Sequence, residues 1–271
     1  MRQNDKKIIR SEIISLMNIT PEHYIMELLC PHIAHNAKPG QFVQVRIDRI
    51  SSDPLLCRPF AVYKISGDTI ELMLKIAGKG TRILSEKPIG DVLDVIGPLG
   101  NGFPLDSDFQ TAIIVAGGMG IASLMGVAES LKERNIVALL GACSQDRLLC
   151  ESELADLGAK TYVATDDGSC GYKGFVSQLL EDILTNPNSM ELRIANSRIF
   201  ACGPLPMLKL VSTIAKAYNI TAYVSLEERM ACGLGACMGC ACKVISTDAS
   251  RQYKMVCSDG PVFDAQEIAW D

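Results

Sequence analysis

The pattern of hydrophobic and polar residues changes near residue 105. Before that point, short segments alternate apolar and polar residues, as in QFVQVRID, where Val43, Val45 and Ile47 share one face. The segments PFAVYKIS and TIELMLKI flank Gly67-Asp68, which is a hairpin signal. Short strands separated by such turns predict a small antiparallel barrel or sandwich over residues 1–105.

From residue 106 to residue 224, apolar segments of strand length alternate with segments of helix length. The expected strands are 112–116, 136–143, 161–165, 198–202 and 221–225. This alternation is typical of a parallel sheet with crossover helices and predicts a Rossmann-like α/β domain. The remaining residues, 225–271, form a short cysteine-rich module.

One uncharged stretch, FQTAIIVAGGMGIASLMGVA at 109–128, is long enough to span a bilayer. Gly117, Gly118 and Gly120 interrupt it directly after a five-residue apolar strand. A buried strand, a glycine turn and a buried helix give the same hydropathy, and we prefer that interpretation. The first twenty residues contain no apolar core of a signal peptide, so we expect a cytoplasmic protein.

Composition narrows the classes of partner. The 271 residues are 48% hydrophobic and 21% charged, which is ordinary for globular domains. The net charge is −5, and the chain has no run of basic residues. Nucleic acid and an anionic membrane surface are therefore poor candidates for a partner.

Four of the eleven cysteines form a single spacing pattern near the C-terminus. The pattern is C-x4-C-x2-C, then sixteen residues and a last cysteine, and its members are Cys232, Cys237, Cys240 and Cys257. This is the spacing of plant-type 2Fe–2S ferredoxins. Gly233, Gly235 and Gly239 would let the loop bend and aim backbone N–H groups at sulfur. The pattern favours an iron–sulfur cluster.

The alternatives for these thiols are zinc, disulfides and simple burial. Zinc usually takes two short cysteine pairs, and the chain has one, Cys237 with Cys240. An odd number of cysteines without a secretory signal argues against a disulfide framework. Cys242 could replace Cys240 only with a spacing that is not known for such clusters. We interpret the others as mostly small buried hydrophobic residues: Cys30, Cys57, Cys143, Cys150, Cys170 and Cys202.

Two turns between a strand and a helix could approach a nucleotide. The first is VAGGMGIAS at 115–123, although Ser123 stands where a third glycine is usual, and the second is ACGPLPMLKLV at 201–211. At the carboxyl ends of parallel strands, both would face one crevice. In the barrel region, KIAGKGT at 75–81 offers a lysine, a bare backbone and a hydroxyl to a phosphate. The alternative for this last segment is a solvated hairpin turn.

Other polar residues give weaker signals. His23, His32 and His35 lie in the first forty residues, away from every other motif, and predict no histidine-based acid–base chemistry. The segment 166–168, Asp-Asp-Gly, is interpreted as a polar turn after a strand. Arg147 is expected either to contact the 2′-phosphate of a nucleotide or to be a surface charge.

Taken together, these motifs resemble the ferredoxin–NADP reductase superfamily and, within it, the electron-transfer subunits of B-type dihydroorotate dehydrogenases. The resemblance covers essentially the whole chain and is most specific in MACGLGACMGCACKV and VCSDGPVFDA, with RPFAVY, GDVLDVIGPLGNGF, TDDGSCGYKGFV and CGPLPM also matching. It implies an FAD-binding barrel at 1–105, an NAD-binding domain at 106–224 and a 2Fe–2S module at 225–271. It also implies an FMN-containing catalytic partner, two of each chain in the complex, and electron flow from dihydroorotate through cluster and FAD to NAD+ in pyrimidine biosynthesis.

The resemblance also assigns site residues. FAD would be lined by Arg58, Pro59, Phe60, Ala61, Met73, Leu74, Lys75, Gly80 and Thr81. The nicotinamide nucleotide would be lined by Gly117, Gly118, Gly120, Cys202, Gly203 and Pro204. Cys202 is expected beside the nicotinamide without acting as a nucleophile. The chain departs from the family pattern at Ala61, usually Ser or Thr, at Lys75, usually Arg, and at Ser123, often Pro.

Two rival functions stay open at this point. One is the small flavin and 2Fe–2S subunit of another NAD(P)H-linked complex, of the transhydrogenase, glutamate synthase or hydrogenase type. In the transhydrogenase relatives an aspartate takes the first cluster position, where this chain has Cys232. The other is a zinc-stabilised binding module without turnover. Colour would separate them, since flavin with a cluster is brown-yellow and zinc is colourless.

Overall fold

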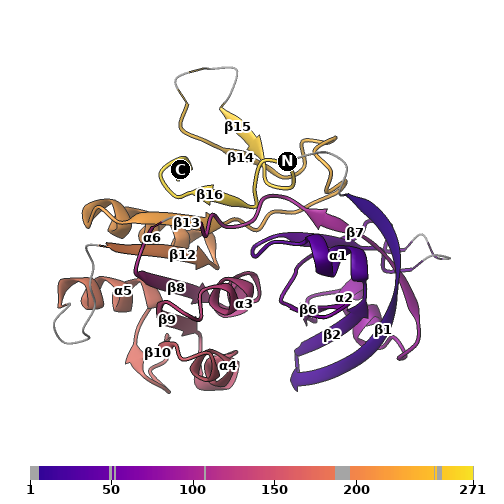
Figure 1. Cartoon of the computed structure of the whole chain (residues 1–271), viewed down its shortest axis with the longest axis horizontal. Helices are drawn as coiled ribbons and strands as arrows, with labels where there is room; N and C mark the ends of the chain where they lie inside the picture. Colours follow the sequence, from indigo (N-terminus) through magenta and orange to yellow (C-terminus); the bar gives the residue numbers. More distant parts are fainter. Residues whose placement is uncertain are drawn as a thin grey trace.

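The computed structural model describes residues 6–48, 51, 53–106, 108–186, 196–246, 248 and 252–270. Two sheets lie side by side, with a small C-terminal hairpin above them (Figure 1). The first sheet is N-terminal and curled, and its strand order is β4-β3-β7-β1-β2-β6-β5. Its strands are β1 (Lys7–Thr20), β2 (His23–Leu29), β3 (Phe42–Val45), β4 (Arg58–Ala61), β5 (Lys64–Ser66), β6 (Thr69–Lys75) and β7 (Val92–Leu99).

Every pairing in this first sheet is antiparallel, which confirms the expected architecture. The sheet is a curled half-barrel, because β4 and β5 stand at its two ends. Gly67-Asp68 joins β5 to β6 as a hairpin, with Ser66 opposite Thr69. Two short helices, α1 (Pro31–Asn36) and α2 (Lys79–Ser85), complete this part of the molecule.

The longest strand, β1, was not predicted. Its burial alternates only as far as Ile14, and beyond that point Met17 is exposed although it has the same parity as buried Ile13. Irregular pairing with β2 near Ile13 and Asn18 shifts the side chains between faces. A period of two therefore could not reveal this strand.

The second sheet has the order β11-β10-β9-β8-β12-β13-β16. Its strands are β8 (Thr111–Gly117), β9 (Asn135–Ala142), β10 (Lys160–Thr165), β11 (Tyr172–Lys173), β12 (Ser197–Cys202), β13 (Thr221–Ser225) and β16 (Val262–Asp264). All pairs are parallel except β13 with β16. The helices of this region are α3 (Ile121–Ser130), α4 (Glu151–Asp156), α5 (Val176–Thr185) and α6 (Leu205–Ala217). The parallel α/β prediction is confirmed, and buried β8 shows why its sequence is a continuous apolar run.

The uncharged stretch at 109–128 folds as β8, a 3₁₀ turn over Gly118–Gly120, and α3, as expected. Across the described part of the chain, no helix is both long and apolar enough to cross a bilayer.

The C-terminal module consists of the cysteine loop, a hairpin of β14 (Ala241–Lys243) and β15 (Tyr253–Met255), and β16. Because β16 pairs with β13, the module supplies the edge strand of the second sheet. Buried Cys240 and Cys257 share one hydrophobic core with residues of β8 and β12. The module is therefore anchored to the α/β region, while the exact domain limits remain a prediction.

Two polar contacts join the half-barrel to the α/β region. The hydroxyl of Tyr63 lies 3.3 Å from the Sγ of Cys150, and both side chains are buried. Arg147 Nη1 donates to Glu22 Oε2 at 3.0 Å. Together with the surrounding apolar packing, these contacts fix the gap between the two sheets.

Candidate cofactor sites

The cysteine loop begins after β13, and the β14–β15 hairpin brings Cys257 back to it. The backbone N–H of Val256 donates to the carbonyl oxygen of Cys240 at 3.0 Å, so these two parts of the chain are adjacent. Cys240 and Cys257 are buried, whereas Cys232 and Cys237 are partly exposed. One side of the cysteine group thus faces the core and the other faces solvent.

Backbone N–H groups of the loop point at sulfur. The N–H groups of Leu234 and Cys237 each donate to Cys232 Sγ at 3.4 Å, and that of Gly235 donates to Cys257 Sγ at 3.1 Å. Gly233 and Gly235 have φ of +68° and +83°, in the left-handed region that glycine adopts most easily. The donation from Leu234 is the main cause that lowers the pKa of Cys232 to about 6. Burial and the neighbouring Cys240 instead raise the pKa of Cys257 to about 12, so without a metal the loop favours a thiolate at Cys232 and a thiol at Cys257.

The four thiols approach in two pairs. The side chain of Cys237 donates toward Cys232, and that of Cys240 interacts with Cys257. Within the described residues, no three His, Cys, Asp or Glu side chains surround one point as the ligands of a single metal ion do. Each iron of a 2Fe–2S centre takes two protein thiolates, so Cys232 with Cys237 and Cys240 with Cys257 could each serve one iron.

The remaining cysteines differ in burial, and Cys57 and Cys170 are only partly buried, so the expectation of buried thiols is met only in part. Cys242 is buried in the β14–β15 hairpin, where its Sγ lies 3.5 Å from the carbonyl oxygen of Lys254. Cys30, Cys150 and Cys202 are also buried. Cys143 was expected to be buried but is exposed, because it lies beyond the end of β9 at the edge of the crevice described next.

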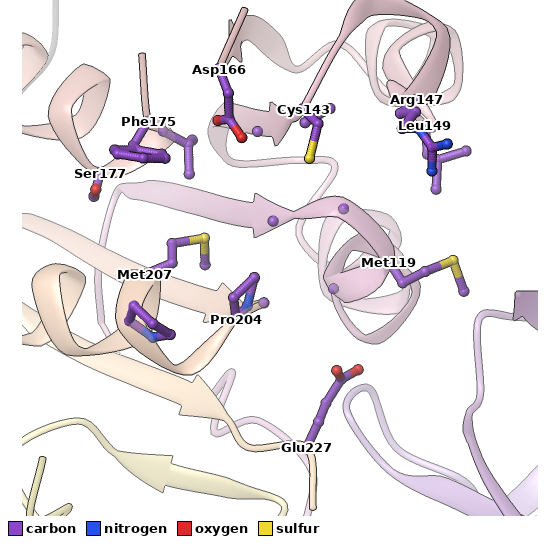
Figure 2. A pocket seen from close by; sticks show the side chains of 18 of the residues that line it. Met119, Cys143, Arg147, Leu149, Asp166, Phe175, Ser177, Pro204, Met207 and Glu227 are labelled. Carbon is purple, nitrogen blue, oxygen red and sulfur yellow. The ribbon is translucent and has the colours of Figure 1, made fainter. Parts of the chain in front are cut away.

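A crevice of about 810 Å³ lies between the carboxyl ends of the parallel strands and the half-barrel. Figure 2 shows Pro204 and Met207 on one wall, Asp166 and Cys143 opposite, and Glu227 reaching in from the start of the C-terminal module. Five of the six residues expected to line a nicotinamide nucleotide are at its surface: Gly117, Gly118, Gly120, Gly203 and Pro204.

Close packing explains the glycines of the crevice. A Cβ on Gly120 would lie 2.1 Å from the carbonyl oxygen of Cys202, and one on Gly117 would lie 2.7 Å from Pro204 and from Met207. The turn after β8 and the turn after β12 can therefore meet only because these positions lack a side chain. The two glycine-containing turns predicted to face one crevice do so.

A second cavity of about 370 Å³ lies against the half-barrel. Pro59, Phe60, Ala61, Met73 and Lys75 line it, as expected for the flavin residues. The two cavities share Lys75, Met119 and Glu227 as lining residues. They therefore meet, and ligands in the two could touch.

The residues expected to hold the phosphates of FAD lie close to one another. The segment 75–81 is the turn from β6 into α2, so its interpretation as a hairpin turn is wrong. A Cβ on Gly80 would lie 3.2 Å from Arg58 Nε, which places the guanidinium directly over this glycine. The Thr81 hydroxyl accepts from the N–H groups of Ala77 and Gly78 and fixes the turn. Arg58, Gly80 and Thr81 line neither cavity, and neither does Leu74, whose side chain packs in the half-barrel core.

Several crevice residues were missed or misjudged from the sequence. His23 is buried, lies opposite Lys75 in the β2–β6 ladder and lines the crevice. The prediction that His23 lies away from every other motif is therefore wrong. Burial, aided by Lys75, lowers the pKa of His23. Asp166 does sit in a polar turn, but it also lines the crevice. Strand register, which the linear sequence does not display, brings these residues together.

Arg147 also lines the crevice, and its guanidinium is paired with Glu22 from the half-barrel. Lys75 Nζ lies 3.8 Å from the same carboxylate. Arg147 thus bridges the half-barrel and the α/β region, and because it also lines the crevice, its contact with a 2′-phosphate stays a prediction.

Cys202 is fully buried and lies behind the crevice wall, so the structure does not bring it to either cavity surface. Burial, with Glu227 adding to the effect, raises the pKa of this thiol to about 12. It is therefore a neutral thiol at physiological pH, which suits the expectation that it is no nucleophile.

Two family models match parts of the chain. The model described as the iron–sulfur cluster binding domain of dihydroorotate dehydrogenase B matches residues 227–269. The model described as the oxidoreductase NAD-binding domain matches residues 114–213. The first contains the cysteine loop, and the second contains both glycine turns of the crevice.

Solved structures share the fold. A structure described for flavin-based electron bifurcation by an NADH-dependent reduced ferredoxin–NADP oxidoreductase has a TM-score of 0.81 at 31% identity, covering 97% of this chain and 91% of that chain. A ferredoxin–NADP+ reductase from Neisseria gonorrhoeae with bound FAD and NADP has a TM-score of 0.66 at 18% identity, covering 78% and 92%. The second likeness shows the fold alone.

Relatives of known name extend over nearly the whole chain. The electron transfer subunit of dihydroorotate dehydrogenase B (NAD(+)) from Desulforamulus reducens is 36% identical over 98% of this chain and 99% of its own length. The subunit of the same name from Geobacillus thermodenitrificans is 39% identical over 96% of this chain and 97% of its own length. With the half-barrel, the α/β region and the cysteine loop all in place, the chain belongs to the family of dihydroorotate dehydrogenase B electron transfer subunits.

Proposed function

We propose that this chain carries electrons from a catalytic dihydroorotate dehydrogenase subunit, through a 2Fe–2S cluster and FAD, to NAD+. A nicotinamide exchanges a hydride, a cluster moves single electrons, and a flavin converts between the two. The observation that carries the proposal is the meeting of the two cavities at Lys75, Met119 and Glu227. A hydride can pass only between groups in contact, and this junction offers that contact.

FAD would occupy the cavity against the half-barrel. Pro59, Phe60 and Ala61 in β4 would support the flavin ring, with Met73 and Lys75 beside it in β6. The stacked guanidinium of Arg58 and the bare backbone of Gly80 would hold the phosphates. Ala61 supplies no hydroxyl, so only backbone groups of this strand are available to bond the ring.

NAD would occupy the larger crevice. The dinucleotide could approach the protein backbone closely at Gly117, Gly118 and Gly120 and at Gly203 and Pro204. Asp166 at the end of β10 is positioned to accept from a ribose hydroxyl, which is a common role for an acidic residue in dinucleotide sites. Cys202 would act from behind the wall by packing alone.

The thiolates of Cys232, Cys237, Cys240 and Cys257 would hold the cluster. Leu234 and Met238, on the solvent side of this loop, have exposed fractions of 46% and 71%. Apolar side chains beside the cluster suit the docking of an FMN-containing catalytic subunit, with two copies of each chain in the complex. Eleven free thiols fit a reducing compartment, and we expect the complex in the cytoplasm.

A second candidate is the small subunit of an NADH-dependent ferredoxin–NADP oxidoreductase. The observation in its favour is the TM-score of 0.81 with such an enzyme. It differs from the first proposal only in the partner chain, so the partner has to be tested.

The experiment measures dye reduction by the purified chain, alone and after addition of a dihydroorotate dehydrogenase catalytic subunit. Alone, the chain should reduce the dye with NADH and should not do so with dihydroorotate, because dihydroorotate would be oxidised on the catalytic subunit. With the catalytic subunit, dihydroorotate should reduce NAD+. Dihydroorotate turnover by partner-free chain, or no coupling in the reconstituted complex, would refute the proposal.

A further inference from the structure

Gln44 in β3 is a buried amide for which the described residues supply no partner. Its exposed fraction is 0%, and neither its Oε1 nor its Nε2 makes a hydrogen bond. A buried polar group without a partner destabilises the folded state. Such a group in a native fold requires a reason.

Gln41, three residues earlier, shows what a structural glutamine looks like in the same segment. It is also fully buried, but its Nε2 donates to the carbonyl oxygen of Gly100 at 2.6 Å. Its Oε1 accepts from the backbone N–H of Lys38 at 2.8 Å. Gln41 therefore satisfies the backbone around it, whereas Gln44 does not.

The two faces of β3 lead to different parts of the molecule. Val43 and Val45 pack into the core of the half-barrel. Phe42 instead packs in the core that contains Cys240 and Cys257, and it lines the cavity against the half-barrel. Alternate residues of a strand share a face, so Gln44 lies on the side of Phe42, toward the C-terminal module.

The amide of Gln44 lies against the cysteine loop. A Cβ on Gly233 would be 2.6 Å from both the Cγ and the Nε2 of Gln44. Gly233 follows the first cluster cysteine and is itself buried. Only glycine leaves room for this contact, so the loop and the glutamine are fitted to each other.

The same side chain is linked to the flavin wall. Gln44 is opposite Pro59 in the β3–β4 ladder, and Pro59 lines the cavity against the half-barrel. Gln44 thus stands between the strand that would support the flavin and the loop that would hold the cluster.

We propose that Gln44 is a positioning residue for the cluster, donating its amide N–H to sulfur on the Cys232 side. This inference rests on the proposed function. Cluster sulfurs accept hydrogen bonds and never donate them, so the NH₂ end of the amide must face them. N–H donors stabilise the more negative, reduced cluster and therefore raise its reduction potential. The bond would also fix the distance between the cluster loop and the flavin wall.

The first test is Gln44→Met, which keeps the length of the side chain and removes the donor. The midpoint potential of the cluster should fall, and its electron paramagnetic resonance spectrum in the reduced state should change, while iron and FAD contents stay at wild-type levels. Gln41→Met is the matched control, since it removes the bonds to Gly100 and Lys38 and should lower thermal stability without shifting the potential. An unchanged potential and spectrum in iron-loaded Gln44→Met would overturn the inference.

A second variant supplies a readout that a packing role would not produce. Gln44→Glu should make the potential depend on pH, because the protonated carboxyl donates to sulfur and the carboxylate repels it. The potential should approach that of the wild type at low pH and fall as the pH rises. A potential with the same pH dependence as the wild type would count against the inference.

A measurement on the wild type avoids any effect of the substitutions on folding. Protein labelled with ¹⁵N in its glutamine side chains should show a hyperfine coupling between the reduced cluster and that nitrogen, and Gln44→Glu should lack it. No coupling in the labelled wild type would overturn the inference. If the wild type held no iron at all, the proposed function itself would fail, which is a different outcome.

Discussion

Glycines shape both the nucleotide crevice and the cysteine loop, but for different reasons. In the crevice, Gly117 and Gly120 let two turns approach until a Cβ would collide with the neighbouring backbone or side chains. In the loop, Gly233 and Gly235 adopt positive φ and turn backbone N–H groups toward sulfur. The crevice is held by protein packing, whereas the loop is held by bonds to its own thiols.

Because of this difference, the two sites should have different requirements for forming. The crevice sits on the ends of buried parallel strands and should keep its shape without a ligand. The loop has few contacts apart from sulfur and the Gln44 side chain, so its order should depend on the cluster. The following predictions test that contrast, beginning with the largest expected effect.

Cys257→Ser should abolish the cluster, because it removes one of two thiolates for one iron at a buried position. Iron content and the visible charge-transfer absorbance should both be lost, while FAD remains. Cys242→Ser is the control, since Cys242 bonds the backbone of its own hairpin, and it should retain both signals. Full iron in the Cys257→Ser variant would show that the ligand assignment is wrong.

Gly120→Ala should destabilise the α/β region by about 1–3 kcal/mol, because the new Cβ would overlap the carbonyl of Cys202. Thermal unfolding would measure the loss, and the KM for NADH should rise. Gly126 lies in α3, the helix that follows Gly120, and a Cβ there would make only ordinary contacts at 3.6 Å or more with Pro39. As the control, Gly126→Ala should be neutral or slightly stabilising. Equal effects of the two substitutions would contradict the packing argument.

Arg58→Ala should weaken FAD binding about tenfold to a hundredfold, because a charge-assisted contact contributes about 1.5–3 kcal/mol. The measurement is FAD retention during dialysis, followed by fluorescence titration of the flavin-free chain. Arg82→Ala, an exposed arginine one turn into α2, should bind FAD as the wild type does. Identical retention in both variants would remove Arg58 from the site.

Cys202→Ala should have the smallest effect, a few-fold slower reduction by NADH with FAD and iron retained. Because burial raises the pKa of Cys202 to about 12, the thiol stays protonated through neutral pH. The rate of reduction by NADH should therefore show no step from this group between about pH 6 and pH 9 in wild type or variant. Stopped-flow traces across that range would test this, and a step that disappears in the variant would show a thiolate role.

The sequence was sufficient to predict those parts of the molecule whose pattern lies within one continuous segment. The five long strands of the α/β region, the hairpin at Gly67-Asp68 and the cysteine spacing are of this kind. β1 was missed because irregular pairing breaks its alternation. His23 and Gln44 could not be recognised, since their importance depends on which strand lies opposite and which loop packs above.

The most direct test of the account is an anaerobic titration of the purified full-length chain with NADH. Absorbance would follow the flavin, and electron paramagnetic resonance would follow the cluster. With about one FAD and about two irons per chain, NADH should bleach the flavin and then produce the signal of a reduced 2Fe–2S centre. A folded chain that holds FAD and iron but stays oxidised in excess NADH would contradict the claim that the two cavities and the cysteine loop form one path for electrons.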